Sequence, residues 1–400
     1  MKTALTLVIF LPLTVSFTFS IFPSSPKPKT KKEIQLGATP FSSMPTKMTK
    51  KTCGKVDLAP KLGPVHNQTA GTCYAYAALD LLNYGTETRY SALHLATIKK
   101  FIPPDPNKKP LNCSGEPQTT PPKRDVFDDV GGLNGGLVDT ASKLGLVMGL
   151  CPESLVPSSD GVLKKDYRKL LEYYAQKTSD SEYCEIDPQL ITLNPELIKA
   201  LNSSVKNKFS TDDVKDEIQR MYPALTAEKV KAIADSSKSV DELVKRLNAS
   251  SCEGNLVKGI PPGKTPENVS TLYNRYQDGC VKFYYEEDRL PLLDKINKAL
   301  DEGRPVSVSY VTGGLIQPPK TKTHGYHASV LGGRSWLDEI KEDGKVIQEA
   351  GCYYQIKNSW GPDWKVPDGV KARTSSNYPG YFVVSEKQLM EHIYGVTTID

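Results

Sequence analysis

The sequence predicts an α+β fold, with helical signals first and strands filling the C-terminal third. Thr72 suits a helix N-cap, and the residues after it, CYAYAALDLLNY, are apolar on almost every face, so the helix that they form must be buried. Apolar residues recur at helical spacing between about residues 194 and 247. Beyond Pro291, β-branched and aromatic runs are separated by turn sequences such as EDGK, a pattern typical of strands.

The remaining elements follow in order along the chain. Gly85 suits the end of the first helix. The run GGLNGGLVDTASKLGLVMGL predicts a glycine turn followed by a second, short helix. Helix-start signals in the middle of the chain fall at Ser210, Thr226 and Ser239. After them, LLDKINKALDEG predicts a helix, and the expected strands are PVSVSYV, YHASVLGG, YYQIKNSW and GYFVV.

Composition indicates a globular protein. The 400 residues are 38% hydrophobic, and this length allows two cores, or one core with a large insertion. The formal net charge is only +5, because Lys and Arg are nearly balanced by Asp and Glu. Nothing in this balance indicates a nucleic-acid partner.

Residues 1–20 have the layout of a secretory signal peptide. One Lys precedes an apolar stretch that ends in small or hydroxylated residues. An uncleaved anchor is the alternative, because the apolar run continues through Ile21 and Phe22. Pro12 argues against a spanning helix, and no other stretch is apolar for long enough to cross a bilayer. We therefore expect export and no stable membrane association once the signal is removed.

Residues 21–52 are rich in Pro, Lys, Ser and Thr and have no hydrophobic period. We interpret them as an extended leader or a short pro-segment. A flexible linker and a Lys-rich patch for anionic surfaces are the alternatives.

The number of cysteines suits an oxidising compartment. The eight positions are 53, 73, 113, 151, 184, 252, 280 and 352. With one residue set aside as a catalytic thiol, the other seven allow three disulfides and a spare thiol. Short separations favour Cys151 with Cys184, or Cys252 with Cys280, although the sequence leaves the connectivity open.

Cys73 is the candidate nucleophile. It falls in the first turn of the buried helix, where unpaired N–H groups and the helix dipole lower the pKa of a thiol. The alternative is a structural cysteine or half of a disulfide. A nucleophilic thiol needs a base, and that base needs a third group to orient it. His327 at the start of a strand and Asn358 in KNSWG can fill these roles, with an indole beside Asn358 to exclude water.

Four separated blocks resemble the papain family of cysteine peptidases. NQTAGTCYAYAA is similar to the family's Gln-loop-Cys motif at the start of its central helix, and GGLNGG is similar to its Gly-Cys-x-Gly-Gly turn. YHASVLGG matches the strand that carries the catalytic His. YYQIKNSWGPDW, followed by GYFVV, resembles the Lys-Asn-Ser-Trp-Gly-x-x-Trp segment almost letter for letter. The resemblance implies a two-lobed fold, with a mainly helical lobe, a β-barrel-like lobe and the active-site cleft between them.

The resemblance also implies roles for individual residues. Cys73 attacks the carbonyl, His327 is its imidazolium partner, and Asn358 orients His327. Gln68 donates a side-chain N–H to the oxyanion together with the backbone N–H of Cys73. Four further positions are implied in substrate binding or in shielding the Asn–His bond, although the residues alone read as a turn or as core: Gly135, Gly136, Tyr326 and Trp360. No metal ligands and no cofactor are implied.

The chain departs from the family pattern in several places. The two cysteines of a family disulfide are replaced together, by Ala70 and Leu133. The loop from Gln68 to Cys73 is one residue shorter than usual, and Tyr74 replaces the usual Trp. The family's long helical pro-domain has no counterpart. The distance from GGLNGG to PVSVSYV exceeds the family norm by on the order of a hundred residues.

These observations predict the domain organisation. A papain-like peptidase domain spans residues 53–400, and a helical insertion falls at about 155–290. The insertion either regulates the cleft as a lid or exosite or decorates the surface. We expect a monomeric, secreted enzyme that is extracellular, periplasmic or in a lysosome-like compartment.

The expected activity is hydrolysis of protein or peptide substrates through an acyl-enzyme. A binding or scaffold protein that recognises a partner through the insertion is one alternative. Acyl transfer to an amine instead of water, by the same thiol and imidazole chemistry, is the other.

Overall fold

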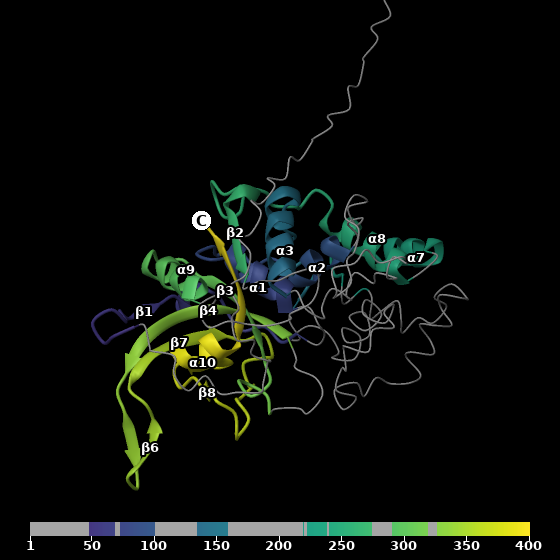
Figure 1. The fold of residues 1–400 in the computed structure, drawn as a ribbon. Helices are drawn as coiled ribbons and strands as arrows, with labels where there is room; N and C mark the ends of the chain where they lie inside the picture. Colours follow the sequence, from purple (N-terminus) through teal and green to yellow (C-terminus); the bar gives the residue numbers. More distant parts are fainter. Residues whose placement is uncertain are drawn as a thin grey trace, which may run out of the picture. The chain divides into compact units, whose positions relative to one another are not determined.

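The computed structural model describes residues 48–68, 73–100, 134–158, 219, 222–237, 240–273, 290–318 and 326–400 (Figure 1). The chain divides into two compact units, Met1–Glu33 and Ile34–Asp400, and every described residue belongs to the second. The predicted signal peptide and most of the predicted leader lie outside the described residues. The same holds for the helix-start residues Thr72, Ser210 and Ser239.

An antiparallel sheet of eight strands organises this unit. Its order is β2-β10-β3-β4-β7-β9-β8, and β1 pairs with β4 beside this path. The strands are β1 (Val56–Asp57), β2 (Val269–Tyr273), β3 (Val306–Val311), β4 (Tyr326–Leu337), β7 (Gly351–Lys357), β8 (Arg373–Thr374), β9 (Tyr381–Ser385) and β10 (Ile393–Ile399). Helices and an antiparallel sheet in one chain confirm the α+β prediction. The four predicted strands are β3, β4, β7 and β9.

Strand β3 explains how the sheet is buried on both faces. All six of its residues are buried. Val306, Val308 and Tyr310 point to one face and join a core cluster with α9 (Leu290–Asp301). The alternating residues Ser307 and Ser309 point to the other face. Their small side chains leave room there for helices α1 (Cys73–Leu82) and α3 (Asn134–Met148), which contact β3. The sheet is therefore packed between two sets of helices.

A separate hairpin projects from the ends of β4 and β7 (Figure 1). It consists of β5 (Ile340–Glu342) and β6 (Lys345–Gln348). The turn residues Asp343 and Gly344 have φ values of 48° and 74°, as a type I′ turn requires at both central positions. The prediction of a turn at EDGK is confirmed.

The helices of the described residues are α1 (Cys73–Leu82), α2 (Ala92–Lys100), α3 (Asn134–Met148), α7 (Ala227–Ser236), α8 (Val240–Cys252), α9 and α10 (Glu386–His392). All ten residues of α1 are buried, as predicted. This helix contacts α2, α3 and β4 at the centre of a second core cluster. The Thr226 hydroxyl accepts from the Lys229 N–H at 3.3 Å, which confirms the predicted cap of α7. Among the described residues, no helix is both long and apolar enough to span a bilayer.

Two disulfides join distant parts of the described chain, Cys53–Cys352 and Cys151–Cys252. The expected pairs Cys151–Cys184 and Cys252–Cys280 are both wrong, because Cys151 and Cys252 bond to each other. The cause is a β-bridge between Leu150 and Val257, whose N–H and C=O groups exchange hydrogen bonds of 2.8 and 2.9 Å. This bridge brings Cys151 to the end of α8, so tertiary pairing decides the partner instead of sequence distance.

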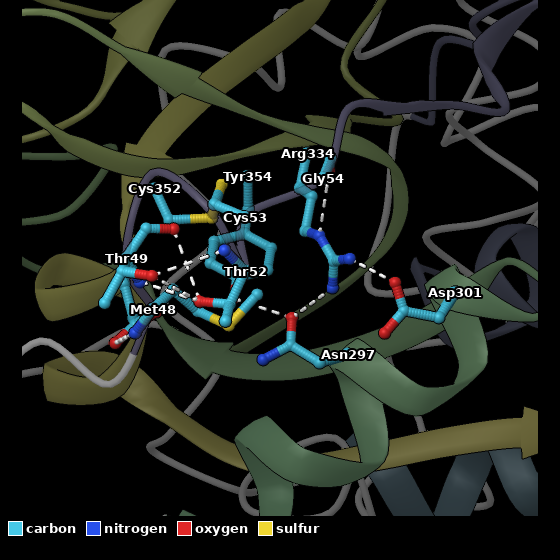
Figure 2. Close-up of a disulfide and its surroundings, with 11 residues drawn as sticks. Met48, Thr49, Thr52, Cys53, Gly54, Asn297, Asp301, Arg334, Cys352 and Tyr354 are labelled. Carbon is cyan, nitrogen blue, oxygen red and sulfur yellow. Dashed lines mark hydrogen bonds and ion pairs between the residues drawn. A yellow bond between two sulfur atoms is a disulfide. The ribbon is translucent and has the colours of Figure 1, made fainter.

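The Cys53–Cys352 disulfide fastens the start of the described chain to β7 (Figure 2). Arg334, whose side chain is 1% exposed, donates to the Gly54 carbonyl at 3.2 Å and to Asn297 Oδ1 at 2.7 Å, and forms an ion pair with Asp301. Beside it, β1 lies so close to β4 that a Cβ at Gly333 would collide with the Val56 carbonyl oxygen. Glycine is therefore required at this position of β4.

Candidate active site

His327 and Asn358 form a buried hydrogen bond at the centre of the site. His327 is the second residue of β4, and Asn358 directly follows the adjacent strand β7. His327 Nε2 lies 2.9 Å from Asn358 Oδ1, and the two residues are 2% and 1% exposed. The pairing of β4 with β7 thus places His327 beside Asn358. Their roles as base and orienting amide stay predictions.

A second contact fixes which ring nitrogen of His327 carries the proton. The backbone N–H of Ser359 donates to Asn358 Oδ1 at 2.8 Å, so this atom of the amide must be the oxygen and not the nitrogen. An amide oxygen only accepts, so the bond from His327 requires a proton on Nε2. In the neutral imidazole Nδ1 then carries the lone pair and is the basic nitrogen.

Aromatic rings enclose the imidazole. The Trp360 ring centroid lies 4.7 Å from that of His327, and Tyr310 contacts it edge-on at 5.6 Å. Burial lowers the pKa of His327 to about 4, and the hydrogen bond with Asn358 opposes this shift. The indole of Trp360 lies beside the Asn–His pair, where the sequence predicts it.

Cys73 is the first residue of α1, is buried and retains its thiol. A helix N-terminus favours a negative charge on a thiol. Cys73 shares a core cluster with Ala328, the residue after His327. Burial raises the pKa of Tyr310, its bond with Ser329 opposes this, and the nearby Cys73 raises it further. The Tyr310 ring is the same one that contacts His327 edge-on.

Gln68 is held next to the Asn–His pair by a short antiparallel bridge. The Gln68 N–H donates to the Ser359 carbonyl at 2.6 Å, and Asn67 pairs with Trp360. The Ser359 hydroxyl donates to Gln68 Oε1. Because the hydroxyl takes the oxygen end of the amide, the NH₂ end of Gln68 is directed away from Ser359. This orientation suits a donor for a substrate oxygen.

A buried ion pair connects the segments that carry these residues. Lys357 Nζ lies 2.7 Å from Asp80 Oδ1 and 3.0 Å from the Leu62 carbonyl. The two charged side chains are 1% and 10% exposed. Burial raises the pKa of Asp80, and Lys357 opposes this shift. Sequence reasoning did not identify this pair; a single Asp in an apolar helix and a single Lys in a buried strand were its signals.

Three other residues with predicted roles in substrate binding lie at the starts of α3 and β4: Gly135, Gly136 and Tyr326. Gly135 and Gly136 lie in the first turn of α3, which begins at Asn134. The end of GGLNGG is therefore helix, where the sequence predicted a turn before the helix, because a first helical turn accepts glycine. Tyr326 opens β4 opposite Val311. Substrate binding by these residues stays a prediction.

Solved structures that are similar to this chain include the following three. The first is PepW from Lactobacillus rhamnosis HN001 (DR20), at 16% identity and a TM-score of 0.39, covering 88% of this chain and 83% of that one. Xylellain, a cysteine protease from Xylella fastidiosa, matches at 14% and 0.33, covering 93% and 99%. The SERA5 proenzyme from Plasmodium falciparum matches at 12% and 0.30, covering 86% and 63%.

No protein-family model matches the sequence, and no curated protein matches it significantly.

Proposed function

We propose that this chain is a papain-like cysteine peptidase that cleaves protein or peptide substrates with Cys73, His327 and Asn358. The observation that carries the proposal is the His327–Asn358 hydrogen bond, whose direction is fixed by the Ser359 N–H. It leaves Nδ1 of His327 as the base, which is the arrangement a thiol nucleophile needs. The residue that would assist the oxyanion, Gln68, is attached to the same segment.

The first half of the reaction is acylation. The thiol proton of Cys73 passes to His327 Nδ1, and the sulfur attacks the carbonyl carbon of the substrate. The carbonyl oxygen becomes an oxyanion, which accepts hydrogen bonds from the Gln68 NH₂ and the Cys73 backbone N–H. The imidazolium then gives its proton to the leaving amine, the C–N bond breaks, and a thioester remains on Cys73.

Hydrolysis completes the cycle. His327 Nδ1 takes a proton from water, and the hydroxide attacks the thioester carbon. A second oxyanion forms in the same place and collapses, expelling the sulfur of Cys73, which regains its proton from the imidazolium. Asn358 holds the ring throughout because it accepts from Nε2 in both protonation states. Because Trp360 and Tyr310 shield His327, water competes little for the His327–Asn358 hydrogen bond.

We also propose that the chain has two lobes. The cleft lies between a helical lobe built around α1 and a β-barrel-like lobe that includes β4 and β7. The separate core clusters around α1 and around α9 support this division. Gly135, Gly136 and Tyr326 line the substrate side, and Trp360 covers the Asn–His bond. No cofactor takes part.

We further propose how the chain is processed and that it is secreted. Residues 1–20 are a signal peptide, 21–52 a leader or short pro-segment, and 53–400 the peptidase, with an insertion at about 155–290 that acts near the cleft. The enzyme is secreted as a monomer. The two disulfides support an oxidising destination.

The decisive experiment combines turnover and labelling. Purified protein should release fluorescent fragments from an unfolded, dye-labelled protein substrate, and Cys73→Ala should reduce this release to background. A papain-directed epoxide should add one inhibitor mass at Cys73, located by peptide mass spectrometry. His392→Gln, on α10 and outside the site, is the matched control and should retain activity.

Two results would refute the peptidase assignment. One is unchanged turnover in Cys73→Ala. The other is a folded wild-type protein that neither turns over substrate nor reacts with the epoxide at Cys73. Products coupled to an added amine, with no hydrolysis, would instead favour acyl transfer to amines.

A further inference from the structure

A cluster of metal-ligating side chains lies outside the proposed active site. It consists of His94 on α2, Cys151 after α3 and Cys252 at the end of α8. Their ligand atoms all lie within 4.8 Å of one another. The three residues are 4%, 0% and 1% exposed. In the structure the two sulfurs form a disulfide, and a ring nitrogen of His94 lies within 4.8 Å of both sulfurs.

One ring nitrogen of His94, the buried Nδ1, has no hydrogen-bond partner among the described residues. A buried polar atom without a partner destabilises a fold, so such an atom calls for an explanation. Asn248 and Ser251, on the same helix one turn and one residue before Cys252, are also buried with side-chain atoms that lack partners. Helix α8 thus carries buried polar groups without partners in the turn that ends at Cys252.

Backbone contacts hold the ligands in place independently of the disulfide. The His94 N–H donates to the Ser91 hydroxyl at 3.0 Å, and the Ser91 N–H donates to the Cys151 carbonyl at 2.8 Å. The Leu150–Val257 bridge fixes the same strand segment from its other side. Cleavage of the S–S bond therefore leaves the two sulfurs and the imidazole close together.

We propose that the reduced form of the protein binds one Zn²⁺ through His94 Nδ1, Cys151 Sγ and Cys252 Sγ. Zinc prefers such a set of thiolate and imidazole ligands, at about 2.3 Å for sulfur and about 2.0 Å for nitrogen. Tetrahedral bonds of these lengths separate the ligand atoms by roughly 3.5–4 Å, a spacing compatible with the cluster. Three protein ligands leave the fourth position to water.

Charge balance favours this ion in a buried place. Two thiolates and one Zn²⁺ sum to zero, so no net charge is placed in the interior. The reduction needs an external reductant, such as a phosphine: the disulfide becomes two thiols, and the phosphine takes the oxygen of one water. Zn²⁺ then displaces the two thiol protons, and the lone pair of His94 completes the bonds.

The consequence is a link between α8 and the segment after α3 in either redox state. Under oxidising conditions it is a disulfide, and under reducing conditions it is a zinc ion. This inference does not depend on the proposed peptidase activity, because none of its three ligands belongs to the Cys73 site.

The test uses the full chain carrying Cys73→Ala, which removes the cysteine that is already free in the described, oxidised structure. The protein is reduced with a phosphine, transferred to anaerobic buffer without reductant, and titrated with Co²⁺ and then Zn²⁺. The expected result is one equivalent of Co²⁺ with a thiolate-to-cobalt charge-transfer band and the visible bands of a tetrahedral site, both lost when Zn²⁺ displaces it. The oxidised protein should give neither band.

Variants and alkylation identify the ligands. His94→Gln should weaken Zn²⁺ binding at least about tenfold, whereas His392→Gln should leave it unchanged. Bound Zn²⁺ should protect Cys151 and Cys252 from alkylation, while Cys53 and Cys352 in the same sample serve as an internal control and react fully.

Three results would overturn the proposal. They are the absence of a stoichiometric cobalt spectrum in reduced protein, equal affinity in His94→Gln, and protection of Cys53 and Cys352 instead of Cys151 and Cys252. Circular dichroism follows folding in each sample. Unfolding on reduction that Zn²⁺ does not reverse counts against the proposal as well.

Discussion

Lys357 Nζ lies 2.7 Å from Asp80 Oδ1 in the interior, between β7 and α1. Its contact with the Leu62 carbonyl adds a third segment, the one that leads to Gln68. Asp80 is two turns after Cys73 on α1, and Lys357 immediately precedes Asn358. One buried cation therefore joins the three segments on which the proposed chemistry depends.

Removal of one charge of this pair should be costly. Asp80→Asn leaves the Lys357 ammonium buried without a counter-charge, so the free energy of unfolding should fall by about 3–5 kcal/mol, measured by urea denaturation. The double variant Asp80→Leu/Lys357→Met should recover much of the loss. Asp338→Asn, which breaks the exposed pair with Lys50, is the control and should change stability by less than about 1 kcal/mol. Equal effects of the buried and exposed changes would contradict this prediction.

Asn358→Ala should impair turnover more than binding. Without Oδ1, His327 loses the acceptor that fixes its tautomer, so kcat should fall about 100-fold while KM changes little. Asn358→Asp should retain more activity, because a carboxylate also accepts from Nε2. Asn377→Ala, an exposed change on the chain that precedes β9, is the control. A larger effect on KM than on kcat would argue against an orienting role.

Ser359 should act through Gln68. Gln68→Ala should lower kcat about 100-fold by removing an oxyanion donor. Ser359→Ala removes the hydroxyl that donates to Gln68 Oε1 and should lower kcat about tenfold, with KM nearly unchanged. In the Gln68→Ala background the Ser359→Ala change should add little, because both act on the same bond. Full additivity in this double-mutant cycle would show that the two residues work independently.

His327 should make stability depend on pH. Its pKa is about 4 in the folded chain, against 6.5 for an unperturbed histidine. Because the folded value is lowered, its contribution is fully present above pH 6.5 and is lost as the pH falls through about 4. In a Cys73→Ala background, the advantage of His327 over His327→Gln should shrink by up to about 3 kcal/mol across this range. Urea denaturation midpoints at each pH measure the difference in stability between the two proteins. A difference that stays constant from pH 6.5 to about 4 would contradict this prediction.

The sequence predicts the local elements well where one pattern dominates. Helix α1 is apolar except for Asp80, and β3 carries three β-branched residues, so composition alone predicts a buried helix and a strand. Strands β2 and β10 were missed: they pair with each other across more than a hundred residues, and the Gly395 in β10 weakens its strand signal. The capping box of α10, in which Ser385 and Gln388 bond reciprocally, is a helix-start signal that is visible in the sequence.

Long-range partners could not be predicted from spacing. The Cys151–Cys252 bond depends on the Leu150–Val257 bridge, and the Asp80–Lys357 pair depends on how α1 lies against β7. By contrast, His327 and Asn358 were found because each lies in a recognisable block. The hydroxyl of Ser359 lies in the same block as Asn358, yet its bond to Gln68 emerges only when the two segments meet.

The Cys53–Cys352 disulfide has a consequence for any cut in the backbone. It joins residues 299 positions apart, so most of the second unit is a closed covalent ring. Cross-linking a loop of this length restricts the unfolded chain and contributes on the order of 5 kcal/mol to stability. A single cleavage anywhere between the two cysteines opens the ring but releases no fragment. A nicked molecule would keep its full mass until a reductant separates it into two chains.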